Sequence, residues 1–543
     1  MENDWQQTPM NCMKTSVKTQ VPKDGWAGLK ENFAADATAG FVVFLLAMPL
    51  SLGIAKASDF PPIMGLVTAI IGGILVSVIS GSRLTIKGPA AGLIVVVAGA
   101  VAAFGGGETG WKLALGAMIV AGLVQVLFGL FKFGKLVDVF PLSAIHGMLA
   151  AIGIIIIVKQ IPVFLDVNPE LYKGMSTVAM ITAIPTFFAN FDPRATMIGV
   201  YSLAIMLGWP YLKNFTLGKI PAPLMVLLVA IPSELAMDFA HTEPPYALLH
   251  IGNLMDSISL HTDFSGVFQT GTFVKYVIMF ALVGSLESLL TVKAIDLADP
   301  FRRKSDTNKD LIAVGLGNTV SAFLGGLPMI SEVARSSANV NQGAKTRWAN
   351  FYHGIFLLVF VLVATPVIEM IPNAALAAML ISVGIKLAHP KEFIHTFQIG
   401  KEQLAIFLVT IFFTLFEDLL IGIAAGVLLK MILHLAKGTP ISSFFKAPTV
   451  VSFNNNQYLV EIDKAAIFSN YLGIKRKLEE IPAGFNVTID LKNTKLVDHS
   501  VMENLHRFQE DYEENGGTVK IIGLEKHQPV SEHALAARKA IVS

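Results

Sequence analysis

Long apolar segments separated by short polar loops fill most of this chain. Most of them are long enough for an α-helix to cross a bilayer, and a shorter apolar piece at 177–190 is either a fifteenth span or a re-entrant segment. Fourteen spans are expected, near residues 34–56, 62–80, 88–104, 111–131, 140–161, 194–212, 217–232, 272–298, 308–325, 331–342, 348–369, 372–388, 403–417 and 418–437. The pattern predicts an α-helical polytopic membrane protein whose transport domain occupies residues 34–437.

Two of these segments are interrupted in the same way. The first break runs through Ser80-Gly81-Ser82-Arg83 and a β-like stretch at 84–86, and a new helix is expected from Gly88. The second follows Gly325-Gly326, continues extended over 327–330, and a new helix is expected near Ser331. Paired interruptions in corresponding halves of a membrane protein point to a transporter's binding site. Half-helices that begin at mid-membrane direct positive N-termini and free N–H groups inward, which suits an anion.

The chain changes character after Lys437. Strand patterns near 458–462, 487–491 and 518–522 alternate with helical patterns, which predicts a small α/β domain over residues 450–543 after a linker at 438–449. Residues 1–33 are polar and lack the apolar stretch of a signal peptide, so they are expected to form a cytoplasmic tail.

The charged residues predict the orientation. Lys and Arg gather in alternate loops, at 132–135, 213–219, 302–304, 345–347 and 386–401, whereas the loop at 232–274 carries acidic residues. The positive-inside rule therefore places both termini in the cytoplasm of a protein in the cell (inner) membrane. The net charge of +1 gives no reason to expect a nucleic-acid partner. No catalytic triad, metal-ligand cluster or nucleotide-binding loop is present, so an enzyme is not expected.

Four blocks of sequence resemble the sulfate permease family, the bacterial relatives of animal solute carrier family 26. They comprise Asp36–Gly40 with Ala47–Ser51, Gly81–Arg83 with Gly88–Ala91, Glu287–Thr291, and Gly325–Pro328 with Arg335–Arg347. The C-terminal region resembles a STAS domain, most clearly at 468–470 and 490–500.

The resemblance implies a specific architecture. It implies two inverted seven-span repeats, a core of spans 1–4 and 8–11 that carries the substrate, and a gate of spans 5–7 and 12–14. Such proteins move inorganic anions, among them bicarbonate, sulfate and chloride, and some move dicarboxylates. The resemblance also implies a homodimer and a cytoplasmic protein partner for the STAS domain.

The expected anion site lies where the two broken spans restart as helices. Small residues there would let an anion approach backbone N–H groups, although they also suit close helix packing. Arg335 matches the arginine that family members place behind the anion, whereas Glu332 is either part of the site or a helix cap. The candidates are Gly88, Pro89, Ala90, Ala91, Ser331, Glu332, Val333, Ala334 and Arg335.

Glu287 is the candidate for the coupling cation because it lies inside an apolar span. It would take a proton, or bind Na⁺ together with Thr291, Ser331 and carbonyl groups of span ten. A structural ion pair is the third interpretation. Bicarbonate-transporting relatives show a similar acid-Ser-Leu-Leu-Thr block with Asp in place of Glu, and they are Na⁺-coupled. Lys293 and Asp296, three residues apart, are expected to pair with each other.

The sequence therefore favours a secondary active transporter that works by alternating access, with Na⁺-coupled bicarbonate symport first. A proton-coupled sulfate or dicarboxylate permease and an anion exchanger are the alternatives, and no cofactor is expected beyond Na⁺ as coupling ion. From other classes, an uncoupled anion channel and a membrane sensor or scaffold acting through the STAS domain stay open. Ser500 stands where related signalling domains carry a phosphorylated residue, but a helix N-cap is the favoured interpretation.

Overall fold

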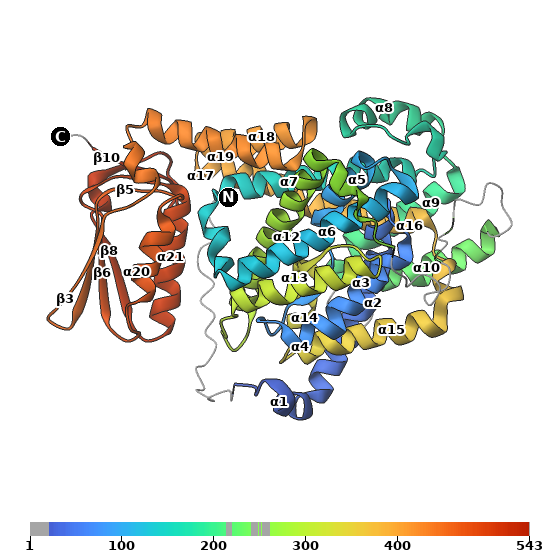
Figure 1. The fold of residues 1–543 in the computed structure, drawn as a ribbon, viewed down its shortest axis with the longest axis horizontal. Coiled ribbons are helices and arrows are strands. Elements are labelled where there is room, and N and C mark those ends of the chain that lie inside the picture. The colour runs from blue at the N-terminus through green and yellow to red at the C-terminus, as the bar shows by residue number, and fades with distance from the viewer. Residues whose placement is uncertain (1–20, 213–219, 240–247, 249–250, 252–260, 542–543) are drawn as a thin grey trace.

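The computed structural model describes residues 21–212, 220–239, 248, 251 and 261–541. Part of the expected N-terminal tail, Lys213, Lys219 and part of the acidic loop lie outside the described residues. The described chain forms a helical part that ends at Ala436 and a C-terminal domain, residues 449–540, beside one end of it (Figure 1). Each of the fourteen expected spans has a helix, and span seven is described from residue 220 onward.

The first half of the helical part runs from α1 to α10. Its elements are α1 (Gly25–Glu31), α2 (Phe33–Ala57), α3 (Pro62–Ile71), η1 (Gly72–Val76), α4 (Ser77–Ile79), β1 (Ile86–Pro89), η2 (Ala91–Leu93), α5 (Ile94–Ala103), α6 (Gly107–Leu130), η3 (Phe133–Val139), α7 (Leu142–Phe164), α8 (Thr177–Ala189), α9 (Pro193–Gly208) and α10 (Ala222–Met237). Within the expected tail, residues 25–31 form a helix whose Asp24 cap accepts from the Gly25 N–H.

The second half contains the other broken span. Its elements are α12 (Thr270–Ala298), α13 (Thr307–Phe323), β2 (Met329–Glu332), α14 (Val333–Asn341), α15 (Trp348–Glu369), α16 (Asn373–Leu387), α17 (Pro390–Ile399), α18 (Lys401–Phe416) and α19 (Leu419–Ala436). Within the described residues, eight helical segments are long and apolar enough to cross a membrane. The broken third and tenth spans are shorter, because each spends part of its length in an extended strand.

The two extended breaks pair with each other. Strands β1 and β2 are antiparallel, with Ile86 opposite Glu332 and Pro89 opposite Met329. Backbone polar groups inside a bilayer must find partners within the protein, and each break supplies them to the other. This pairing prolongs both extended segments beyond the expected points. The first helix therefore starts at Ala91 rather than at Gly88, and the second starts at Val333 rather than at Ser331.

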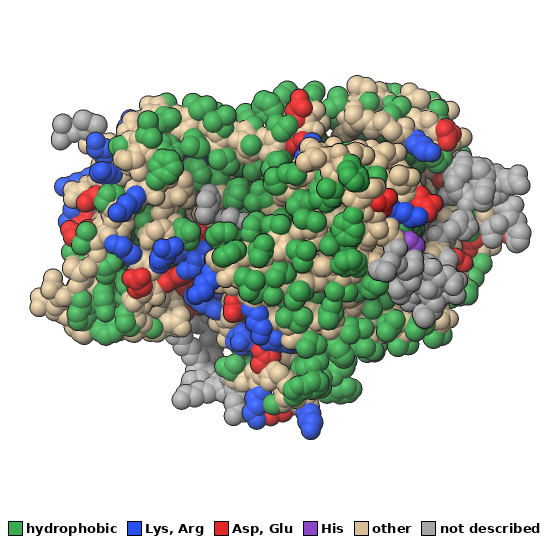
Figure 2. Space-filling view, in the orientation of Figure 1, with side chains coloured by type: hydrophobic (Ala, Val, Ile, Leu, Met, Phe, Trp, Pro, Cys, Tyr) green, Lys and Arg blue, Asp and Glu red, His purple; other side chains and the backbone are tan. Residues whose placement is uncertain are grey.

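Apolar side chains cover much of the visible face of the helical part (Figure 2). On α15, Val359, Leu362 and Val363 are more than half exposed, and Leu428 and Ile432 of α19 are as well. Exposed apolar surface of this kind marks contact with lipid or with another protein. A multi-pass membrane protein accounts for it directly, because lipid tails are as apolar as these side chains.

The C-terminal domain is the expected α/β unit. Its elements are β3 (Thr449–Asn454), β4 (Gln457–Ile462), β5 (Lys464–Ala466), α20 (Tyr471–Glu479), β6 (Asn486–Asp490), β7 (Thr494–Val497), α21 (His499–Glu514), β8 (Thr518–Ile522), β9 (His527–Pro529) and β10 (Arg538–Ala540). One sheet has the order β3-β4-β6-β8 and the other β5-β7-β10-β9. The domain begins one residue before the expected boundary at 450, and the preceding linker contains a short turn, η10 (Ile441–Phe444).

Candidate functional site

Arg335 lies across the start of both half-helices. Its side chain is 1% exposed, and Nη2 donates to the carbonyl oxygen of Pro89 over 3.2 Å. A Cβ at Gly88 would lie only 2.6 Å from Nη1, so glycine there makes room for the guanidinium. Among the described residues, Nε and Nη1 are buried and have no hydrogen-bond partner. Buried donors without partners are rare, and free donor groups on a buried guanidinium suit an oxyanion, which accepts charge-assisted hydrogen bonds.

Glu332 is the N-cap of α14. Its Oε2 accepts from the backbone N–H of Arg335 at 2.7 Å and lies 4.0 Å from Arg335 Nε. The capping interpretation is thus confirmed, and a direct substrate role stays a prediction. The next two residues, Val333 and Ala334, are exposed, so the described chain leaves the first turn of α14 uncovered. Ala90 and Ala91 are buried, so the start of η2 is covered.

Glu287 is buried in α12 and forms no ion pair among the described residues. Its carboxylate lies against Gly92 in the first turn of the half-helix, where a Cβ would overlap both carboxylate oxygens. Oε1 has no hydrogen-bond partner within the described part of the chain. The structural ion-pair interpretation of Glu287 is therefore wrong. Thr291 follows one turn later on α12 and is also buried.

The expected Lys293–Asp296 pair is wrong as well. Lys293 pairs with Asp138 in η3, and Asp296 accepts hydrogen bonds from Ser305. Asp138 lies between α6 and α7 and Ser305 lies in the loop after α12, so both charges find their partners outside α12.

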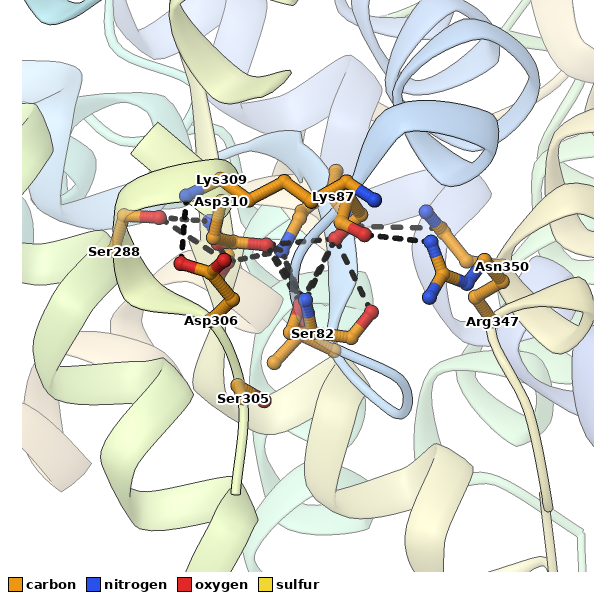
Figure 3. Close-up of polar contacts among 12 residues, drawn as sticks. Ser82, Lys87, Ser288, Ser305, Asp306, Lys309, Asp310, Arg347 and Asn350 are labelled. Carbon is orange, nitrogen blue, oxygen red and sulfur yellow. Dashed lines mark hydrogen bonds and ion pairs between the residues drawn. The ribbon is translucent and has the colours of Figure 1, made fainter. Parts of the chain in front are cut away.

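Sequence reasoning missed Lys87, which lies in β1 directly before Gly88. The lysine is fully buried and pairs with Asp310 of α13 at 2.9 Å. Figure 3 shows Lys87, Ser82 and Asp310 converging between the two broken spans. The available signal was the pair itself, one basic and one acidic residue inside apolar segments, where ionisable groups are costly and mark function.

Ser331 was expected to contribute to both the anion site and the coupling-cation site. In the structure, the Ser331 hydroxyl oxygen instead accepts a hydrogen bond from Lys87, whose Nζ lies 2.6 Å from Ser331 Oγ. Ser288 of α12 donates to the same oxygen at 3.1 Å. A lysine ammonium repels a second cation, so Ser331 is a poor Na⁺ ligand in this arrangement.

Ser500 is not the N-cap of α21. Asp498 is the cap and accepts from the Val501 N–H at 2.8 Å, whereas Ser500 is buried and accepts from Lys430 of α19 at 3.0 Å. Lys430 also lies 3.3 Å from Asp498. Burial opposes the charge of Asp498, but Lys430, His434 and backbone N–H groups outweigh it and lower the pKa of Asp498. Ser500 therefore belongs to a buried contact between the C-terminal domain and the membrane part.

Comparison with known proteins places this arrangement in a family. Residues 33–410 match the model of the sulfate permease family. A putative sulfate transporter, YvdB of Bacillus subtilis, is 30% identical over 415 residues, which cover 75% of this chain and 74% of the relative. The bicarbonate transporter BicA of Picosynechococcus is 26% identical over 439 residues, with coverages of 80% and 75%.

A solved structure shows the same fold. The overall structure of SLC26A9 matches with a TM-score of 0.65 and 15% identity, covering 91% of this chain and 85% of that one. The fourteen-span fold with a C-terminal domain that fits a STAS domain is thus confirmed. The homologues are transporters rather than enzymes, and their names include sulfate and bicarbonate transporters. The chain therefore belongs to the sulfate permease family and is a multi-pass transporter of inorganic anions.

Proposed function

We propose that this protein is a proton-coupled symporter of an inorganic oxyanion, with sulfate ahead of bicarbonate. The observation that carries the proposal is the buried guanidinium of Arg335 at the start of α14, whose Nε and Nη1 have no hydrogen-bond partner among the described residues. An oxyanion there would accept from Arg335 and lie near the N-terminal turns of η2 and α14. The name of the B. subtilis relative, a putative sulfate transporter, supports sulfate as the first substrate to test.

The charges around this site call for a cation to accompany the anion. Glu332 pairs with Arg335, and Glu287 adds a second carboxylate at the start of the other half-helix. The Glu287 carboxylate lies at Gly92, in the first turn of the half-helix, where a substrate anion would be attracted. A proton on Glu287 removes the repulsion between the two anions. Proton binding at Glu287 therefore favours anion binding at the start of the same half-helix.

A proton fits Glu287 better than Na⁺ does. A hard cation prefers several oxygen ligands, but Ser331 is already engaged by Lys87. Proton coupling therefore ranks ahead of the Na⁺ coupling that the sequence favours. Na⁺-coupled bicarbonate transport is the second candidate, favoured by the Glu287–Thr291 block and by the similarity to BicA.

The remaining parts of the proposal follow the family pattern. Spans 1–4 and 8–11 act as a core that moves against a gate of spans 5–7 and 12–14, in a homodimer with both termini in the cytoplasm. Arg347 binds Asp24 beside α1, and Lys304 binds Asp511 of the C-terminal domain. The loops that carry these basic residues are the ones that the positive-inside rule assigns to the cytoplasm.

The test is uptake of labelled sulfate and bicarbonate into proteoliposomes, under an inward proton gradient or an inward Na⁺ gradient. The proposal predicts sulfate uptake that follows the proton gradient and loses this dependence in Glu287→Gln. Bicarbonate uptake that needs Na⁺ would support the second candidate. Absence of saturable uptake of either anion would contradict both and favour a scaffold that acts through its C-terminal domain.

A further inference from the structure

The ammonium of Lys87 sits in a cage of oxygen atoms. Five oxygens lie within 3.0 Å of Nζ: Ser82 Oγ at 2.8 Å, Thr85 Oγ1 and Ser331 Oγ at 2.6 Å, and the two carboxylate oxygens of Asp310 at 2.9 and 3.0 Å. The side chain of Lys87 is 0% exposed and that of Asp310 is 2% exposed. The cage therefore excludes solvent and is built entirely from the protein.

Lys87 Nζ has more oxygen neighbours than an ammonium group has N–H donors. An ammonium has three N–H donors, so two of the five oxygens are held by charge rather than by a dedicated hydrogen bond. Four separate oxygen-bearing side chains around one positive centre, one of them an acid, form the kind of shell that hard cations select. A simple ion pair would require only Asp310.

We propose that this cage is a binding site for a monovalent cation and that the tethered ammonium of Lys87 is its occupant. Removal of the amine leaves Asp310 and the three hydroxyl groups as ligands for Na⁺ or K⁺. The cation in this cage is thus part of the protein chain and is not exchanged with solvent.

The position of the cage explains why a cation is needed there. Ser82 and Thr85 precede β1, Asp310 lies on α13, and Ser331 lies on β2. Asp310 also accepts from Ser80 at 2.6 Å and from the Ser82 N–H at 3.2 Å. One positive charge therefore joins the paired strands β1 and β2 to α13. Without it, the carboxylate of Asp310 would be a buried charge with no counter-ion among the described residues.

The test compares thermal unfolding of the purified full-length chain in NaCl, KCl and N-methylglucamine chloride at equal ionic strength. Three proteins are compared: wild type, Lys87→Ala, and the double variant Lys87→Ala/Asp310→Asn. Ligands that bind only the folded state raise the unfolding temperature. The readout is independent of uptake, so it does not depend on the proposed function. The wild-type response measures any effect of these ions at other sites, including Glu287.

The proposal predicts that Lys87→Ala unfolds several degrees below wild type in N-methylglucamine and recovers selectively in Na⁺ or K⁺. The double variant should be stable in all three salts and show no selective response, because the carboxylate that attracts the cation is gone. Recovery of Lys87→Ala on acidification but not with small cations would overturn the proposal, since a proton on Asp310 would then suffice. Failure of either variant to fold in any salt would also overturn it.

Discussion

The Nη2 atom of Arg335 donates to the carbonyl oxygen of Pro89 over 3.2 Å and so links the starts of the two half-helices. Only Nη2 takes part in this link, and Nε and Nη1 remain buried without hydrogen-bond partners among the described residues. In the proposed function, Arg335 thus binds both the opposite strand, β1, and the anion.

Replacing Arg335 by lysine keeps the positive charge but loses the fork of donors. We expect Arg335→Lys to lower kcat/KM for sulfate uptake by about tenfold or more, since charge-assisted hydrogen bonds contribute about 1.5–3 kcal/mol each. Uptake kinetics in proteoliposomes measure this effect. The control is Arg302→Lys in an exposed loop, which should leave the kinetics unchanged. Equal kinetics for Arg335→Lys and wild type would remove Arg335 from the anion site.

Gly92→Ala tests the contact between the half-helix and Glu287. The new methyl group would overlap the carboxylate oxygens, so it must displace Glu287, and overpacking of this kind costs about 1–3 kcal/mol. We expect proton-driven uptake to fall by about tenfold or more, with a lower unfolding temperature. Gly99→Ala, two turns later on α5, is the matched control. Its nearest neighbour is the Tyr276 hydroxyl at 3.1 Å, which can shift. Similar losses in both variants would show a general packing effect.

The buried pair of Lys430 and Asp498 should hold the C-terminal domain to the membrane part. Asp498→Asn leaves Lys430 without its counter-charge, and breaking one partner of a buried pair costs about 3–5 kcal/mol. We expect faster hydrogen exchange at the start of α21 and faster proteolysis of the linker at 438–449. Asp511→Asn is the control, because its partner Lys304 is 74% exposed and such pairs contribute about 0–1 kcal/mol. Unchanged exchange in Asp498→Asn would refute this role.

Asp166, in the loop after α7, should make stability depend on pH. Burial and the nearby Asp192 raise the pKa of Asp166 to about 6, against the opposing effect of Lys56. A carboxyl group whose folded-state pKa is raised binds its proton more tightly in the folded state, so its contribution to stability increases as pH falls. As pH falls from about 7 to about 4, we expect the unfolding temperature of wild type to increase relative to that of Asp166→Asn. An identical pH profile in both proteins would contradict the assignment.

The sequence predicted the elements that depend on local pattern. Apolar segments gave the spans, and the Gly and Pro residues around 81–92 and 325–328 located the two breaks. The starts of the half-helices were placed two or three residues early, because the pairing of β1 with β2 is a long-range contact. Local propensity contains no information about a partner strand more than two hundred residues away.

The same difference between local patterns and long-range contacts applies to the candidate site. Arg335 and Glu287 could be identified because each is a charge in an apolar setting. Lys87 was missed because its partner, Asp310, lies on another span. The sequence does not show that α13 packs beside Lys87, so the burial of this lysine cannot be recognised from the residues around it. The misassigned pair of Lys293 and Asp296 has the same cause, since spacing along one helix does not reveal partners in η3 and in the following loop.

The most direct test of the proposed anion site is to locate the anion itself. Selenate has the shape and charge of sulfate and can be found by anomalous scattering in crystals of the full-length protein. The account predicts a selenium peak between the N-terminal turns of η2 and α14, with an oxygen within hydrogen-bond distance of Nε or Nη1 of Arg335. A fully occupied peak elsewhere, with Nε and Nη1 of Arg335 still without partners, would contradict it.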